Sequence, residues 1–260
     1  MSDISYPEPP AFPAGSLVQQ LRRATRDLHA RAERTGIVAS ILAGTATRSA
    51  YAVYLRNLLP VYQAMEHALE QYRDTPGIGA LTWPALYRAP GIIADIAELA
   101  GPGGLESLPL LPAAERYAAR IAWAGAGDGG LLLAHAYTRY LGDLSGGQIL
   151  ARRLGQIFGP DFQATAFMAF PGIGDVAVFA KAFRARLNDA LDLVADPEGV
   201  VREALVAFDL NIALSCEVAD AQCQSDKRCA AALPALSGIA GYADVCNDQS
   251  SMAGDKNGCR

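Results

Sequence analysis

The hydrophobic positions of the chain recur at helical spacing. Leucine and alanine follow Ser16, a typical helix N-cap residue, in steps of three and four positions, and Gly36 is expected to end this first helix. A short apolar turn is expected next, through Leu42. Tyrosine and leucine continue the helical pattern from Thr47 to Tyr72. We find no strand-like alternation of useful length, so the sequence predicts an all-α chain.

The later hydrophobic runs complete the predicted architecture. Residues 1–15 are rich in proline and have no hydrophobic period, which predicts a disordered N-terminal arm. Residues 219–260 mix cysteine with small and polar residues, and we expect a loosely structured extension there. A single domain is therefore predicted over 16–218. Within it, further helices are expected at 92–99, 113–124, 131–157, 174–194 and 198–218.

The composition is that of a globular protein with an acidic surface. Hydrophobic residues make up 51% of the 260 positions, charged residues make up 19%, and the formal net charge is −5. A disordered chain would be less hydrophobic. A nucleic-acid-binding surface would be basic. We therefore exclude disorder for the main body and expect no nucleic-acid partner.

The ends of the chain bear on location and redox state. The N-terminus has no basic segment followed by an apolar core, and the apolar runs elsewhere are short and interrupted. We therefore expect no signal peptide, no membrane anchor and a cytoplasmic protein. All five cysteines lie between Cys216 and Cys259. Reduced thiols on an extension are the favoured interpretation, and a redox or metal-binding role is the alternative.

One histidine on the first predicted helix shares a face with charged side chains. Arg22, Arg26, His29 and Glu33 follow the spacing i, i+4, i+7 and i+11, which places them on one helical face. An imidazole can ligate iron, and nearby cations can bind the carboxylates of a ligand. Glu33 could orient the imidazole ring. The alternative is a solvated surface, with the arginines paired to Asp27 and Glu33.

Glycines interrupt a predicted helix that is otherwise strongly hydrophobic. Each glycine costs about 1 kcal/mol relative to alanine in a helix interior. Gly142 and Gly146 lie one turn apart on the same side, so a flat ligand could contact bare backbone there, and Gly147 would widen this surface. The alternative is a tight crossing of two helices at this Gly-x-x-x-Gly spacing.

A carboxylate and an arginine accompany these glycines. Asp143 lies between Gly142 and Gly146, and Arg139 precedes it by one helical turn. A carboxylate beside a bare ligand-binding face can hold water and transfer protons. An ordinary ion pair on the protein surface is the alternative for the two side chains.

Four segments together resemble the haem oxygenase family. LRRATRDLHARAE (21–33) is similar to the family's proximal helix, and AHAYTRYLGDLSGGQIL (134–150) is similar to its distal helix signature. FAKAFRARLNDAL (179–191) and AFDLNIALS (207–215) resemble later helices of the family. The resemblance covers about 17–218. It implies a single-domain, all-α fold with haem between a proximal and a distal helix.

The resemblance also implies roles for particular residues. His29 matches the iron ligand, and Glu33 matches the acid that orients it. Asp143 matches the carboxylate that organises distal water, and Asn211 matches a supporting position. The implied catalytic set is Asp143, Arg139, Gly142 and Gly146. The implied haem-binding set is Arg22, Arg26, His29, Tyr137, Gly147, Lys181, Arg184 and Phe208.

The implied activity is the oxidative opening of haem b, as both cofactor and substrate, to biliverdin, carbon monoxide and ferrous iron. No flavin or nicotinamide motif is found, so electrons for the reaction with O2 are expected from a separate reductase or ferredoxin-like protein. A monomer is expected. Arg22 and Arg26 replace lysines that are frequent in the family, which leaves the attacked ring carbon open. The alternatives are a non-catalytic haem carrier or sensor on the same fold, and a helical scaffold without haem.

Overall fold

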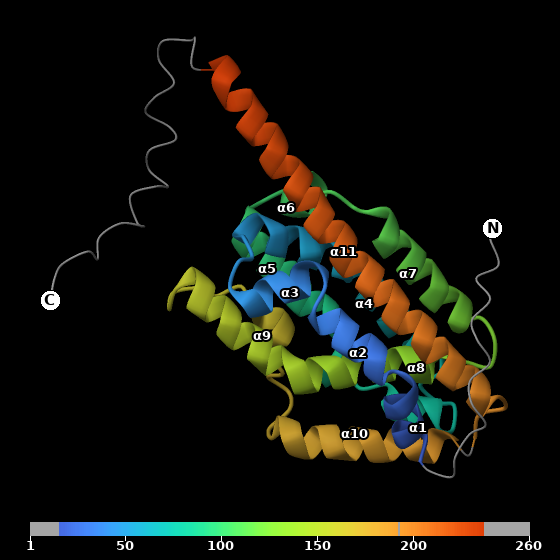
Figure 1. Cartoon of the computed structure of the whole chain (residues 1–260). Helices are drawn as coiled ribbons and strands as arrows, with labels where there is room; N and C mark the ends of the chain where they lie inside the picture. Colours follow the sequence, from blue (N-terminus) through green and yellow to red (C-terminus); the bar gives the residue numbers. More distant parts are fainter. Residues whose placement is uncertain (1–15, 192, 237–260) are drawn as a thin grey trace, which may run out of the picture. The chain divides into compact units, whose positions relative to one another are not determined.

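The computed structural model describes residues 16–191 and 193–236, and no strand occurs in these ranges, as the sequence predicts. Contacts divide the chain into two units, Met1–Ala219 and Asp220–Arg260. The helices (Figure 1) are α1 (Leu17–Ala24), α2 (Arg26–Glu33), α3 (Gly36–Ala43), α4 (Arg48–Gln71), α5 (Ala89–Ala100), α6 (Gly104–Ser107), α7 (Pro112–Ala124), α8 (Leu132–Ala136), α9 (Gly142–Phe158), α10 (Val176–Leu191) and α11 (Pro197–Leu236). The shorter turns are η1 (Ile78–Leu81), η2 (Pro84–Leu86), η3 (Tyr137–Leu141) and η4 (Ala166–Met168).

The N-terminal region forms two short helices where the sequence predicted one. Ser16 caps α1 as predicted, because its hydroxyl accepts from the Gln19 amide and the Gln19 side chain accepts from the Ser16 amide. The helix breaks at Thr25, whose hydroxyl donates to the Leu21 carbonyl at 2.8 Å. Such a bond competes with regular helix geometry and often bends the chain.

Gly36 begins a helix and does not end one, which corrects the sequence prediction. Its φ is +61°, and a Cβ atom at this position would lie 2.3 Å from the backbone carbonyl carbon of Ser215. Glycine alone tolerates this conformation together with so close an approach. The segment that follows is helix α3 and not the short apolar turn that was expected.

Helix α4 is central to the core. It contacts α3, α5, α7 and α8, and most of its residues are buried. The largest completely buried side chains include Tyr51 and Tyr62 on α4, Tyr117 on α7, Tyr140 on η3 and Phe183 on α10. Burying one large apolar side chain contributes roughly 1.5–3 kcal/mol. The ring centroids of Tyr140 and Phe183, 6.1 Å apart, join η3 to α10, and Arg139 of η3 is hydrogen-bonded to Tyr62 of α4.

The long helix predicted over 131–157 is divided into three pieces. Helix α8 ends at Ala136, the five residues of η3 form a π-helical turn, and α9 continues to Phe158. A π-helical turn inside an α-helix is rare and is frequently found at functional sites. Here the turn contains Tyr137 and Arg139, two of the predicted site residues.

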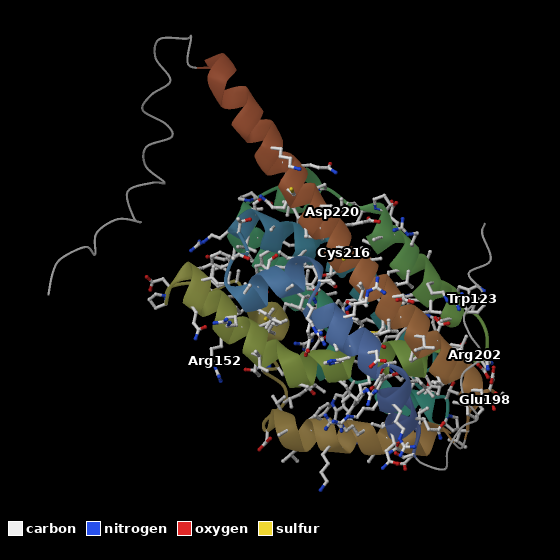
Figure 2. The ribbon with its side chains drawn as sticks, viewed as in Figure 1. Trp123, Arg152, Glu198, Arg202, Cys216 and Asp220 are labelled. Atoms are coloured by element: carbon white, nitrogen blue, oxygen red, sulfur yellow. The ribbon has the colours of Figure 1, made fainter. Side chains whose placement is uncertain are left out.

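Helix α11 continues to Leu236, so the prediction of a loosely structured extension is wrong for residues 219–236. Cys216, half-buried on this helix (Figure 2), and the exposed Cys223 carry free thiols. The predicted arm at 1–15 and residues 237–260 lie outside the described residues. In the described part of the chain, no helix is both long enough and apolar enough to cross a membrane.

Candidate functional site

His29 lies on a helix that buries none of its residues. Its side chain is 59% exposed, and its Nδ1 is 3.6 Å from Oε1 of Glu33, one turn along α2. Its ring centroid is 6.0 Å from that of Phe208 on α11. Because Glu33 lies beside Nδ1, Nε2 is the ring nitrogen left for a metal ion. By contrast, His135 is completely buried, and its Nε2 is bonded to Glu203 at 2.9 Å.

The two segments singled out in the sequence meet at Tyr137. Its side chain interacts with that of Thr25, the residue immediately before α2. The charges of Arg22 and Arg184 also act on Tyr137. Arg184 in turn donates to the Ser145 hydroxyl at 3.4 Å. The structure therefore brings α1, α10 and the segment 134–150 together. Arg22 of α1 and Arg184 of α10 are the cations that act on this junction.

The other predicted cations are placed differently. Arg26 extends into solvent, where its Nε is 3.4 Å from Oδ1 of Asp27. Lys181 is exposed on α10. Either side chain would have to turn toward a ligand to contact it, whereas Arg22 and Arg184 already lie near Tyr137.

Two of the three predicted glycines face open space. A Cβ atom at Gly142 or at Gly146 would have no neighbouring atom within 4 Å. Gly147 differs from the sequence prediction of a wider bare surface. It is buried, and its Cβ direction meets Met168 at 3.7 Å. The bare face of α9 is therefore formed by Gly142 and Gly146.

We predict opposite effects of the substitution Gly142→Ala on stability and on activity. The methyl group meets nothing in the ligand-free protein, so replacing a helical glycine should stabilise the fold by about 1 kcal/mol. The family resemblance implies that haem lies against this face, so the same methyl group should crowd it and lower biliverdin formation at least about tenfold. Thermal unfolding and turnover measure the two effects. Gly155→Ala, also on α9 with open space around it, should give the stability gain alone; equal turnover in both variants would contradict the assignment.

Asp143 belongs to a buried hydrogen-bonded cluster. Arg139 donates from Nε and Nη2 to the Tyr62 hydroxyl at 2.9 and 2.6 Å. Because a hydroxyl has one proton, Tyr62 then donates that proton to Oδ2 of Asp143, at 2.5 Å. Nη1 of Arg139 donates to Asn211 at 2.5 Å, and Nη2 lies 3.5 Å from Oδ1 of Asp143.

The surroundings of Asp143 shift the pKa of its carboxyl group in two opposing directions. Burial raises the pKa of Asp143, while the positive charge of Arg139 and the hydrogen bond from Tyr62 oppose the rise. The side chain keeps 11% of its surface exposed. A carboxyl group in this setting can accept and return a proton beside the bare face of α9.

Sequence reasoning missed Tyr62 and its neighbour Glu66, one turn along α4. Glu66 is buried and accepts the backbone amides of Arg88 and Ala89 at 2.5 and 3.1 Å. Burial raises the pKa of the Glu66 carboxyl group to about 7, against the opposing effect of these two bonds. Polar residues at i and i+4 on a buried helix were the available signal, but nothing local linked them to Asp143.

Glu66 predicts a pH dependence of stability. Because its folded pKa is raised, its contribution to stability is present below about pH 4.5 and is lost as the pH rises to about 7. The loss is at most about 3 kcal/mol, since one pKa unit corresponds to about 1.4 kcal/mol. In Glu66→Gln this loss should disappear, with Glu98→Gln, an exposed acid on α5, as the control. Unfolding at about pH 5 and pH 8 measures it, and parallel pH profiles for the parent and Glu66→Gln would refute the prediction.

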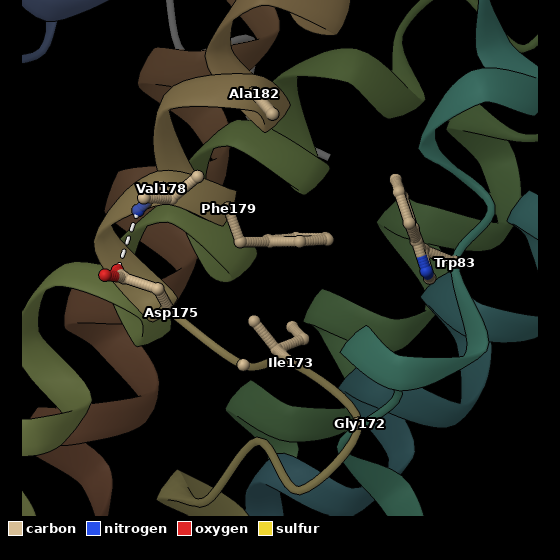
Figure 3. Close-up of a pocket in the computed structure, with 8 residues that line it drawn as sticks. Trp83, Gly172, Ile173, Asp175, Val178, Phe179 and Ala182 are labelled. Atoms are coloured by element: carbon tan, nitrogen blue, oxygen red, sulfur yellow. Dashed lines mark hydrogen bonds between the residues drawn. The ribbon is translucent and has the colours of Figure 1, made fainter.

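A separate shallow hollow lies between α10 and η2. It is lined by Trp83, Ile173, Phe179 and the neighbouring Asp175 (Figure 3). Asp175 accepts the amides of Ala177 and Val178 and so caps α10. None of the predicted site residues lines this hollow, so it is distinct from the site around His29.

Comparison with known proteins identifies the family of the chain. A family model described as Heme oxygenase matches residues 15–217. Heme oxygenase 1 of Pongo abelii is 34% identical over 214 residues, which cover 81% of this chain and 74% of that protein. Heme oxygenase 1 of a Nostoc species is 36% identical and covers 76% of this chain and 84% of that protein. The predicted family resemblance is thus confirmed.

Two solved structures also resemble the fold of this chain. Heme oxygenase-1 of Synechocystis, determined in complex with heme, has a TM-score of 0.77 and 31% identity, and the match covers 83% of this chain and 98% of that one. The enzyme from Leptospira interrogans has a TM-score of 0.72 and 29% identity, with 78% and 100% of the two chains covered. The chain belongs to the heme oxygenase family.

Proposed function

We propose that this protein is a haem oxygenase that opens haem to biliverdin, carbon monoxide and ferrous iron. It consumes O2 and electrons, and haem is both its cofactor and its substrate. One observation carries the proposal: the half-exposed His29 lies on a helix without buried residues, and Thr25 and Tyr137 join that helix to the segment with the bare face.

The residues present fit haem on both faces and at its edge. His29 would ligate the iron through Nε2, with Glu33 holding Nδ1. The bare backbone at Gly142 and Gly146 would lie over the other face. Arg22 and Arg184, whose charges both act on Tyr137, would bind the propionates. Bound haem supplies the iron that binds oxygen and the ring carbon that is oxidised.

The buried cluster would supply protons to the oxygen face. Arg139 holds the Tyr62 hydroxyl oxygen, so the Tyr62 proton points at Oδ2 of Asp143. Asp143 can then fix a water molecule beside the glycines and pass a proton to it. A non-catalytic carrier would need His29 but would have no use for this cluster, so the alternative is not favoured.

Hemin titration followed by turnover tests the proposal. Hemin added to the purified full chain should give a Soret band of bound haem, and a reductant with air should then replace it with the absorption of biliverdin. Absence of a Soret change would contradict haem binding. A stable Soret band without biliverdin would contradict catalysis and leave the carrier.

Sequence features alone support three further parts of the proposal, which are the electron donor, the oligomeric state and the location. The chain has no motif for a flavin or a nicotinamide, so we propose a separate reductase or ferredoxin-like donor. We also propose a cytoplasmic monomer. Sedimentation of the purified chain tests the monomeric state.

A further inference from the structure

The turn η4 contacts both elements that carry the Tyr62–Asp143 pair. The ring of Phe167 meets the ring of Tyr62 edge-on, with 5.6 Å between centroids. Met168 lies beside Gly147 on α9, and its carbonyl accepts from Nε2 of Gln148 at 3.0 Å. A shift of η4 would therefore disturb the contact with Tyr62 on α4 and the contacts with α9.

One face of α5 forms a seat for η4. Asp95 accepts the Ala166 amide on Oδ1 and the Phe167 amide on Oδ2, each at 2.8 Å. One turn earlier, a Cβ atom at Gly91 would lie only 2.8 Å from the Ala166 carbonyl oxygen. Glycine and aspartate at i and i+4 thus allow the close approach and supply the two acceptors.

Arg88 completes the seat from the start of α5. Its Nη1 donates to the Phe167 carbonyl at 3.2 Å and also to the Ala169 carbonyl. Its guanidinium lies 4.1 Å from the ring centroid of Phe170. The backbone of η4 is therefore held on its amide side by Asp95 and on its carbonyl side by Arg88.

Because Asp95 is buried, its hydrogen bonds to η4 are important for the stability of this region. The residue is 2% exposed, and burial raises its pKa although both amide bonds oppose the rise. Burying a carboxylate is unfavourable unless its oxygens are hydrogen-bonded, so the bonds to η4 offset a substantial penalty. A substitution of Asp95 should therefore disturb the position of η4 first.

We propose that Asp95 is a positioning residue for the haem oxygenase reaction. With Gly91 and Arg88 it fixes η4 against Tyr62 and α9, and thereby aligns the Tyr62 hydroxyl with the Asp143 carboxyl group. The inference rests on the proposed function, because the alignment matters only where Asp143 handles protons. Asp95 itself acts through η4 and does not touch haem.

Two substitutions disturb the seat by independent routes. Asp95→Asn keeps one acceptor and presents an NH2 group to the second amide of η4. Gly91→Ala forces the Ala166 carbonyl away. In both, we expect turnover to fall about tenfold while the hemin dissociation constant changes less than about twofold. Amide hydrogen exchange at Ala166 and Phe167 should accelerate in the ligand-free protein.

Asp189→Asn, at an exposed acid on α10 and with the same change of charge as Asp95→Asn, is the matched control. If the two seat variants turn over like Asp189→Asn, the inference is overturned. It is also overturned if hemin affinity falls as much as turnover, since the seat would then serve the haem site or the fold as a whole. A parent chain that makes no biliverdin overturns the proposed function as well; an active parent with unaffected variants overturns this inference alone.

Discussion

Replacing His29 with alanine is expected to lower biliverdin formation by more than about 100-fold and to weaken hemin binding. Loss of a residue that merely orients a metal ligand typically costs about 10–100-fold, so loss of the ligand itself should exceed that range. The side chain is already exposed on a helix without buried residues, so its removal creates no cavity in the core. The unfolding temperature should therefore stay close to that of the parent chain.

His67, exposed on α4, supplies the control for this substitution. His67→Ala should bind hemin and turn over like the parent chain. Hemin titration and biliverdin absorption measure both variants. Undiminished turnover in His29→Ala would remove His29 from the site, and equal losses in both variants would point to a general effect of losing a histidine.

The second large effect is expected at Asp143. In Asp143→Ala, hemin should still bind through His29, but biliverdin formation should fall by about 100-fold or more, the range typical of a lost general acid or base. Asp143→Asn should behave similarly, because the amide oxygen can accept the hydrogen bond from the Tyr62 hydroxyl but the amide cannot transfer a proton at neutral pH. Bound haem without its proton source should react as a peroxidase-like oxidant.

Asp189→Asn, an exposed acid on α10, is the control for this loss of charge. The Soret band, the rate of biliverdin formation and peroxidase activity toward a dye are compared in the three variants. Normal biliverdin output from Asp143→Ala would exclude Asp143 from the reaction. Loss of the Soret band in that variant would assign it to haem binding instead.

Local spacing was enough to predict several parts of the site. His29 and Glu33 lie one turn apart on α2, and Gly142 and Gly146 lie one turn apart on α9, so helical periodicity alone places each pair. The all-α fold follows from the same periodicity. The hydrogen-bonded cluster at Asp143 does not, because Tyr62 is distant in sequence and is brought there by the packing of α4 against the distal segment.

The errors in the sequence prediction have physical causes of the same kind. Glycine commonly ends helices, so the local sequence favours a helix end at Gly36, whereas the deciding feature is the backbone of Ser215 on α11. Gly147 was grouped with the other glycines, but Met168 of η4 lies against it. The break at Thr25 depends on one side-chain bond to the Leu21 carbonyl. The contacts at Gly36 and Gly147 are specified by tertiary structure, whereas the bond at Thr25 is local.

A structure of the full chain with hemin bound tests the proposed haem site most directly. We expect Nε2 of His29 to ligate the iron, the opposite face of the ring to lie against the backbone of Gly142 and Gly146, and the propionates to reach Arg22 and Arg184. Iron ligated by another residue, or haem bound in the hollow beside Trp83, would contradict the proposed site.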